Sequence, residues 1–212
     1  MTVDKLIAAR GITEVLHFTK NLGLTGTLHS RAVKSRQQLE RDNELVYIFE
    51  PNASYRKDVR WLNHVNLSIS DINSEFFRVS SCNWHAGRDL WWCILSFSPE
   101  ILRHEGVVFT TTNNIYTGVQ RGVEAAGLEA LFAPRIVRWN GNLVTRPNTL
   151  SSNLTTCEQA EVLYPVQVST DFLQRIYVRT EEDADDVNGQ LAIYGQRPEI
   201  VVLPAKFRGA VR

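Results

Sequence analysis

A glutamine and a glutamate stand two positions apart in the stretch TTCEQAEVLYP, residues 155–165, where the chain enters an apolar run. If a strand begins here, Gln159 and Glu161 point to the same face of a sheet. A carboxylate beside a sugar can accept a hydrogen bond from a hydroxyl, stabilise an adjacent cationic centre or take a proton from a nucleophile. An amide can bind a second substrate without adding charge. From spacing alone, a solvated polar pair at a strand edge is the simpler interpretation.

Two regions nearer the N-terminus carry further side chains that suit a substrate site. His17 lies within a predicted apolar strand over 14–19, where Thr19 shares its face, although a lone histidine there is more often a structural residue. Arg56 precedes a predicted strand over 64–70, and an arginine at that point offers a fork for phosphate oxygens. The chain lacks the GxGxxG and GxxxxGKS/T loops that bind dinucleotides, so side chains of this kind would have to hold one.

Short strands and short helices must position these residues, and they alternate irregularly along the chain. Period-2 alternation in HVNLSIS and the continuous apolar run DLWWCILSF are typical of strands. The expected strands cover 14–19, 64–70, 89–97, 106–112, 160–165, 175–180 and 199–204. The expected helices lie within 22–42, 72–80, 98–102, 123–133 and 181–195. This order favours one α+β domain over residues 1–212 rather than a doubly wound sheet.

The neutral net charge conceals an uneven distribution of acids and bases. The chain has 23 basic and 23 acidic residues, and five of the acids lie in EEDADD, 181–186. Acids are favourable at a helix N-terminus, so this run is interpreted as helix chemistry rather than a metal site. The remainder, with 23 basic and 18 acidic residues, is able to present a basic face to a polyanion. The basic groups are Arg31, Lys34 and Arg36; Arg56, Lys57 and Arg60; and Arg135, Arg138 and Arg146.

Cysteine usage and the N-terminus indicate a cytoplasmic protein. The three cysteines are widely spaced and show no CxxC or Cys/His ligand pairing, so we expect reduced structural thiols. The N-terminal stretch mixes acids with apolar residues and has no long apolar region, unlike a signal peptide. No window approaches the roughly 20 apolar residues of a membrane span.

Taken together, these residues resemble a specific family. A histidine within a strand, an arginine suited to phosphate, a central polar strand and Gln-x-Glu follow one another as in ADP-ribosyltransferases. The segments HFT, LSIS, WWCILSFSPEIL, FTTTNN and TCEQAEVLYP further resemble the DarT family, toxin enzymes that ADP-ribosylate single-stranded DNA. The resemblance runs from about residue 12 to 180. It implies an ADP-ribosyltransferase-like split mixed β-sheet with peripheral short helices and NAD in the cleft between the halves.

The resemblance also implies roles for individual residues. Glu161 matches the catalytic glutamate, which holds the 2′-hydroxyl of the nicotinamide ribose and helps deprotonate the acceptor base, and Gln159 matches the residue that faces the acceptor. Arg56 matches the arginine for the pyrophosphate or the transition state, and Arg60 is a competing candidate. The positions implied for NAD binding are His17, Phe18, Thr19 and Ser68, and those at the pocket mouth are Asn113 and Asn114.

The function expected from this resemblance is a toxin that transfers ADP-ribose from NAD, used as a substrate, to thymine or guanine in single-stranded DNA without a metal. A single strand avoids the cost of base flipping, and Trp61 and Trp84 are candidates for base stacking. We expect a monomer, without membrane association, neutralised by an antitoxin ADP-ribosylglycohydrolase of the macrodomain type or another. Two alternatives remain open: an ADP-ribosyltransferase acting on RNA, protein or a small molecule, and a non-catalytic nucleic-acid-binding module.

Overall fold

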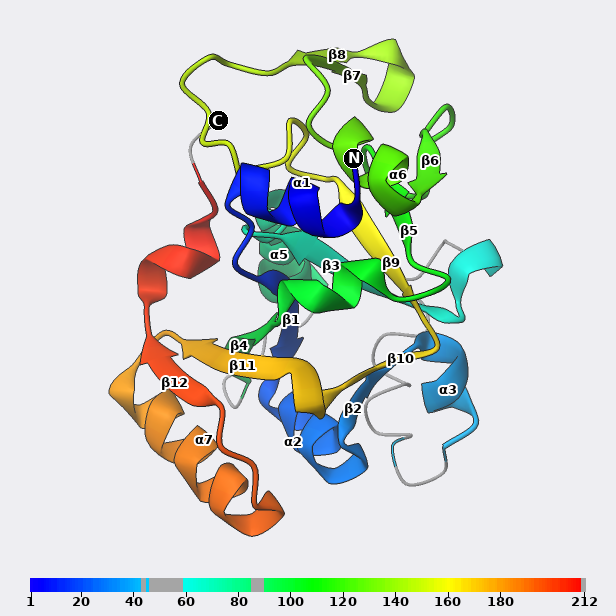
Figure 1. The fold of residues 1–212 in the computed structure, drawn as a ribbon. Coiled ribbons are helices and arrows are strands. Elements are labelled where there is room, and N and C mark those ends of the chain that lie inside the picture. The colour runs from blue at the N-terminus through cyan, green and yellow to red at the C-terminus, as the bar shows by residue number, and fades with distance from the viewer. Residues whose placement is uncertain (43–44, 46–58, 85–89, 211–212) are drawn as a thin grey trace.

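The computed structural model describes residues 1–42, 45, 59–84 and 90–210, and its centre is a mixed eight-stranded sheet (Figure 1). The strands are β1 (Val15–Lys20), β3 (His64–Ile69), β4 (Trp92–Phe97), β5 (Val108–Thr110), β6 (Arg121–Val123), β9 (Glu161–Pro165), β11 (Leu173–Val178) and β12 (Glu199–Val202). They lie in the order β12-β11-β4-β1-β3-β9-β5-β6. Neighbours are antiparallel except β11 and β12, which are parallel. The α+β class predicted from the sequence is confirmed.

The sheet is split between β1 and β3. These two strands share only two residue pairs, Val15 with Ile69 and Leu16 with Ser68. Beyond them, β1 continues along β4 as far as Lys20, whereas β3 continues along β9. The two halves of the sheet therefore diverge from a closed end. We call this divergence the split.

Different elements cover the two faces of the sheet. One, here called the α2 face, packs against α1 (Val3–Arg10), α2 (Asn21–Ser30), α6 (Glu124–Ala130) and α7 (Glu181–Tyr194). The other, here called the α5 face, carries α5 (Ser74–Val79) through Phe77 and the 3₁₀ turn Pro204–Arg208 through Phe207. Because strand side chains alternate between faces, Val15 packs into the core under α2 and Leu16 into the core under α5.

Two small sheets and a short helix lie around the main sheet. One pairs β2 (Ala32–Lys34) with β10 (Gln167–Ser169), and the other pairs β7 (Arg135–Val137) with β8 (Leu143–Thr145) at the top of Figure 1. The helix α3 (Arg36–Glu40) begins at Ser35, whose hydroxyl accepts a hydrogen bond from the backbone N–H of Gln38. Residues 22–42, expected to be helical with glycine breaks, thus also contain a strand.

The main elements predicted from the sequence are present with shifted ends. The run DLWWCILSF forms β4, where Trp92 is 7% exposed and Cys93 is fully buried, as expected of a central strand. The acidic run begins α7, whose first turn is capped by the Thr180 hydroxyl. Cys93 and Cys157 are buried free thiols, as expected of structural cysteines, whereas Cys82 is exposed.

Candidate active site

Glu161 is the first residue of β9 and lies in a row of residues that crosses the sheet. Its partner on β5 is Thr110, and the partner of Thr110 on β6 is Arg121. On the other side, the β3–β9 ladder continued by one residue sets Ser68 beside Glu161. Ser68 is in turn opposite Leu16 of β1. Glu161 and Ser68, both half-buried, therefore lie on the α5 face next to the closed end of the split.

Asn114 contacts the Glu161 carboxylate directly. The backbone N–H of Asn114 donates to Glu161 Oε2 at 2.8 Å. The side chain of Asn113 instead accepts a hydrogen bond from the backbone N–H of Ile115, within its own turn. Of the two asparagines considered for the pocket mouth, the structure thus places Asn114, rather than Asn113, against Glu161. Arg121 holds Asn114 in turn and was not foreseen from the sequence.

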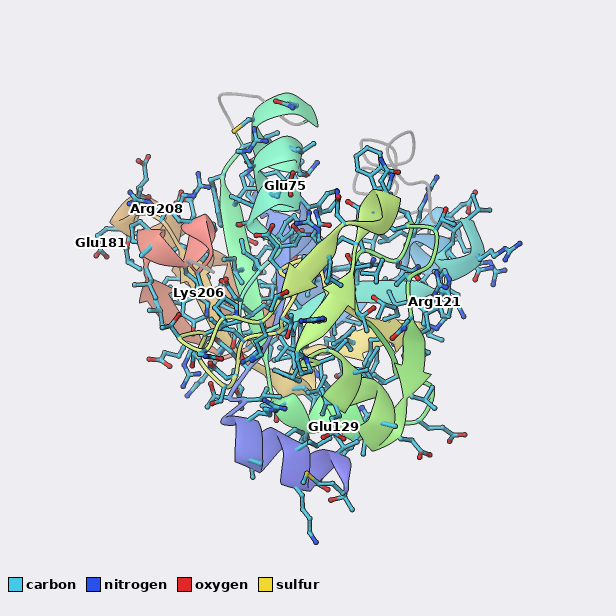
Figure 2. All side chains as sticks on the ribbon, turned by 90° about the horizontal axis from the view of Figure 1, so that it is seen from above. Glu75, Arg121, Glu129, Glu181, Lys206 and Arg208 are labelled. Carbon is cyan, nitrogen blue, oxygen red and sulfur yellow. The ribbon has the colours of Figure 1, made fainter. Side chains whose placement is uncertain are left out.

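Gln159 lies in a turn before β9, so the shared-face argument from strand periodicity does not apply to it. The residue is 5% exposed, and its Nε2 donates at 3.2 Å to Oε2 of Glu75, which is carried by α5 and labelled in Figure 2. The same oxygen of Glu75 lies 3.7 Å from Arg138. Since a carboxylate only accepts hydrogen bonds, this contact orients the amide with Nε2 toward α5. Within the described part of the chain, Gln159 Oε1 has no hydrogen-bond partner.

His17 bridges the split where the β1–β3 ladder ends. Its Nδ1 lies 3.0 Å from the backbone carbonyl oxygen of Asn66 on β3. Because a carbonyl only accepts, Nδ1 must carry the proton in this contact. The imidazole therefore joins the two halves through a side chain at the point where backbone pairing stops. This is a structural contact, yet it lies beside the opening in which NAD is expected.

The other two residues of the HFT segment point to opposite faces. A Cβ atom at Gly23 of α2 would overlap Thr19 Oγ1, so the glycine allows the helix to approach Thr19 closely. Phe18 points to the α5 face, where its ring contacts three aromatic rings: Phe76, Phe77 and Trp92. Phe18 thereby supports α5, the helix that carries Glu75.

The structure describes only one of the two arginines that were predicted to bind NAD. Arg56, together with Lys57 and Asp58, lies outside the described residues. Arg60 is described in a 3₁₀ turn before β3, and its side chain is exposed. Arg146, counted among the basic groups, donates to the backbone carbonyls of Ser151 and Leu154. It therefore stabilises the loop that leads to Gln159.

An exposed aromatic pair lies over the basic β7–β8 region. Trp139 is 59% exposed and stacks on Tyr116, with ring centroids 6.2 Å apart and planes at 22°. Trp61, expected to stack bases, is half-buried and contacts the ring of His64 and the guanidinium of Arg121. The side chain of Trp84 lies outside the described set. Trp61 and Trp84 were favoured for base stacking from the sequence, and Trp139 was not singled out.

A second polar cluster lies at the closed end of the split. The Glu14 carboxylate, in a residue 7% exposed, accepts hydrogen bonds from Ser96 Oγ and Tyr177 OH, each at 2.9 Å. Lys206 Nζ donates to the other oxygen of Glu14 and to the backbone carbonyl of Ser70. Burial, followed by the hydrogen bond to Glu14, raises the pKa of Tyr177 to about 12, so the phenol stays a neutral donor.

The described residues hold no other obvious centre of chemistry. A surface hollow lies beside the end of α7, lined in part by Asn188, Gln196 and Arg197, and includes none of the predicted site residues. No group of three or more His, Cys, Asp or Glu side chains in the described ranges is arranged to hold a metal ion. In the same ranges, no helix has the length and apolar character needed to cross a membrane. Geometry at Glu161, rather than the size of a hollow, identifies the candidate site.

Solved DarT structures share this fold. Thermus sp. 2.9 DarT in complex with NAD⁺ has a TM-score of 0.63 at 15% identity, over 91% of this chain and 96% of that one. Thermus sp. 2.9 DarT in complex with ADP-ribosylated ssDNA has a TM-score of 0.61 at 16% identity, over 92% and 96%. Thermosipho africanus DarTG in complex with ADP-ribose has a TM-score of 0.58 at 14% identity, over 92% of this chain and 51% of that one.

Sequence comparison identifies the family. No curated protein matches the chain. The family model for DarT, described as an ssDNA thymidine ADP-ribosyltransferase, matches residues 16–208, from β1 to the last 3₁₀ turn. The resemblance noted in the sequence is confirmed: the chain belongs to the DarT family of ssDNA thymidine ADP-ribosyltransferases.

Proposed function

We propose that this chain transfers ADP-ribose from NAD⁺ to a thymidine base in single-stranded DNA, and that Glu161 is its catalytic glutamate. The observation that carries this proposal is the position of the Glu161 carboxylate. It lies beside Ser68 near the split and receives a backbone hydrogen bond that orients one of its oxygens. A carboxylate held in this way is suited to bind a ribose hydroxyl and to stabilise positive charge on the sugar.

The proposed reaction exchanges one bond at the ribose C1′ atom. The bond from C1′ to the nicotinamide nitrogen breaks, and its electron pair leaves with neutral nicotinamide. A nitrogen of the thymine ring attacks C1′ and loses its proton, which Glu161 accepts and passes to water. The enzyme supplies orientation and charge stabilisation, because NAD⁺ already carries a good leaving group.

Other residues are assigned to the same site. Ser68 and His17 are proposed to contact NAD⁺ at the split, and Thr19 to line the same opening beneath α2. Arg56 is proposed to bind the pyrophosphate, with Arg60 as the alternative. Gln159 is proposed to face the acceptor base, because it lies two positions before Glu161 and Glu75 of α5 fixes the orientation of its amide.

The DNA strand is proposed to pass the Tyr116–Trp139 pair. Arg138 ties this region to Glu75 and hence to Gln159, so the pair is connected to the side of the site where the acceptor is expected. Exposed aromatic rings stack on bases without reading their sequence, and nearby arginines attract the phosphates. The basic Arg135 and Arg138 of this region supply that attraction.

We further propose that the chain is a toxin and acts as a monomer in the cytoplasm, where its two substrates occur together. Its partner would be an antitoxin that removes ADP-ribose from DNA. This chain matches 51% of Thermosipho africanus DarTG, which supports a second component in that relative. The proposed partner would hydrolyse the new bond at C1′.

The test uses oligonucleotides that differ in one base. Single strands that contain either thymine or guanine, but not both, are incubated with the protein and NAD⁺, and mass spectrometry detects an added ADP-ribosyl group. We expect modification of the thymine strand alone, and a loss of about 10²–10⁴-fold in rate for Glu161→Gln. Glu158→Gln, three residues earlier in the preceding turn, is the matched control and should retain activity. Labelling of RNA or protein in place of DNA would refute the assignment.

A further inference from the structure

The orientation of Glu161 depends on a residue distant in sequence. Glu161 Oε2 accepts the backbone N–H of Asn114 at 2.8 Å, across 47 positions of the chain. A backbone donor has no rotamer freedom of its own, so the loop that carries it determines where the carboxylate oxygen lies. Asn114 is only 3% exposed, which places this contact in a region of low dielectric where a hydrogen bond to a charged group is strong.

Arg121 fixes Asn114 at two points. Its Nε donates to Asn114 Oδ1 and its Nη2 donates to the backbone carbonyl oxygen of Asn114, both at 2.8 Å. Two parallel bonds from one planar guanidinium fix both the position and the orientation of Asn114. Because Oδ1 faces Arg121, the amide Nδ2 points elsewhere and has no hydrogen-bond partner among the described residues.

Strand pairing brings Arg121 and Glu161 into the same row of residues across the sheet. Arg121 lies opposite Thr110, and Thr110 lies opposite Glu161, so the loop 111–120 leaves and rejoins the same row of residues. The next residue, Gly122, lies so close to Gly127 of α6 that a Cβ atom on Gly127 would overlap it. Close helix contact therefore anchors β6, and the base of the Arg121 side chain with it.

We propose that Arg121 and Asn114 are positioning residues, which hold the Glu161 carboxylate in the orientation that transfer requires. This inference rests on the proposed function of Glu161. Neither residue needs to touch the substrate: Arg121 acts on Asn114, and Asn114 acts on Glu161. Loss of either side chain releases the loop and lets the carboxylate rotate, while the sites that bind NAD⁺ stay in place.

The first test is steady-state kinetics with Arg121→Ala, Asn114→Ala and the double variant. We expect each single variant to lower kcat about 10- to 100-fold, with KM for NAD⁺ changed less than about threefold. The double variant should be no slower than the slower single variant, because both substitutions break one arrangement. Arg103→Ala is the control, since Arg103 forms an exposed pair with Asp4.

The second test measures the protection of the loop 111–120 directly and does not depend on enzymatic activity. Hydrogen exchange of the Asn114 amide should accelerate about tenfold or more in Arg121→Ala, while the amide of Cys93 in central β4 stays protected. An unchanged Asn114 amide, or a wild-type kcat in Arg121→Ala, would overturn the inference. Loss of kcat together with loss of protection at Cys93 would also overturn it, because it would show a general structural defect. Should the wild-type protein transfer nothing to DNA, the proposed function fails, and the exchange result still decides whether Arg121 holds the loop.

Discussion

Replacing Lys206 with methionine removes one charge from the polar cluster at the closed end of the split. Lys206, labelled in Figure 2, donates from its ammonium to the Glu14 carboxylate and to the Ser70 carbonyl. Methionine keeps much of the length and apolar stem of lysine but has no donor. In Lys206→Met, Glu14 is left with two neutral donors, Ser96 and Tyr177, for a carboxylate that is almost fully buried.

The expected loss of stability follows from that burial. Removing one partner of a buried ion pair costs about 3–5 kcal/mol. The Lys206 side chain is 16% exposed, so water can partly replace it, and we expect a value near the lower end, about 3 kcal/mol. For a chain of this size, that corresponds to a fall of about 6–12 °C in Tm. Tyr177 cannot replace the lost positive charge, because a phenol is either neutral or negative, and its pKa raised to about 12 keeps it a neutral donor.

Urea unfolding of Lys206→Met and of Arg208→Met measures this loss. Arg208 lies in the same 3₁₀ turn and is exposed, so its substitution should cost less than about 0.5 kcal/mol. Adding Glu14→Gln to Lys206→Met should recover part of the stability, because a neutral amide does not require an ammonium partner. The reasoning is refuted if Lys206→Met is as stable as Arg208→Met, or if the added Glu14→Gln destabilises it further.

Two further predictions concern pH and DNA. Burial lowers the pKa of His64 from its ordinary 6.5. As pH falls below about 6.5, His64 binds a proton in the unfolded chain but not yet in the folded chain, so the folded state loses stability. His64→Asn should reduce the difference in unfolding free energy between about pH 7.5 and 5.5, and an unchanged pH slope would contradict this. Trp139→Ala should raise KM for the DNA strand about 5- to 150-fold, the range expected for one stacked base, and leave KM for NAD⁺ unchanged. Equal KM values for DNA in both proteins would remove Trp139 from the proposed strand path.

The local sequence pattern was sufficient to predict the central strands and to place Glu161 at the start of one of them. Alternation in HVNLSIS and the apolar run of β4 reflect burial on one or both faces, which sequence records directly. Strands of three residues, such as β2 and β10, are too short to show a period. Pairing between distant segments determines them, and the same is true of the Asn114 contact with Glu161, which joins a loop to a strand 47 residues away.

Side-chain roles were harder to predict than elements. Arg146 belongs to a basic group in the sequence, yet its guanidinium binds backbone carbonyls of a neighbouring loop. Gln159 and Glu161 share a spacing typical of one strand face, yet the chain turns between them, and α5 rather than the strand orients Gln159. In each case a partner that is remote in sequence decides which atoms are available.

The short pairing between β1 and β3 has a consequence for how this protein can diverge. Among the described residues, two residue pairs, the His17–Asn66 contact and the adjoining Glu14 cluster fasten the two halves of the sheet, so the angle between the halves depends on few residues. Substitutions there can widen or narrow the opening while leaving Glu161 and its supports untouched. Under the proposed function, selection or a protein engineer can therefore adjust which acceptors enter the opening separately from the residues around Glu161.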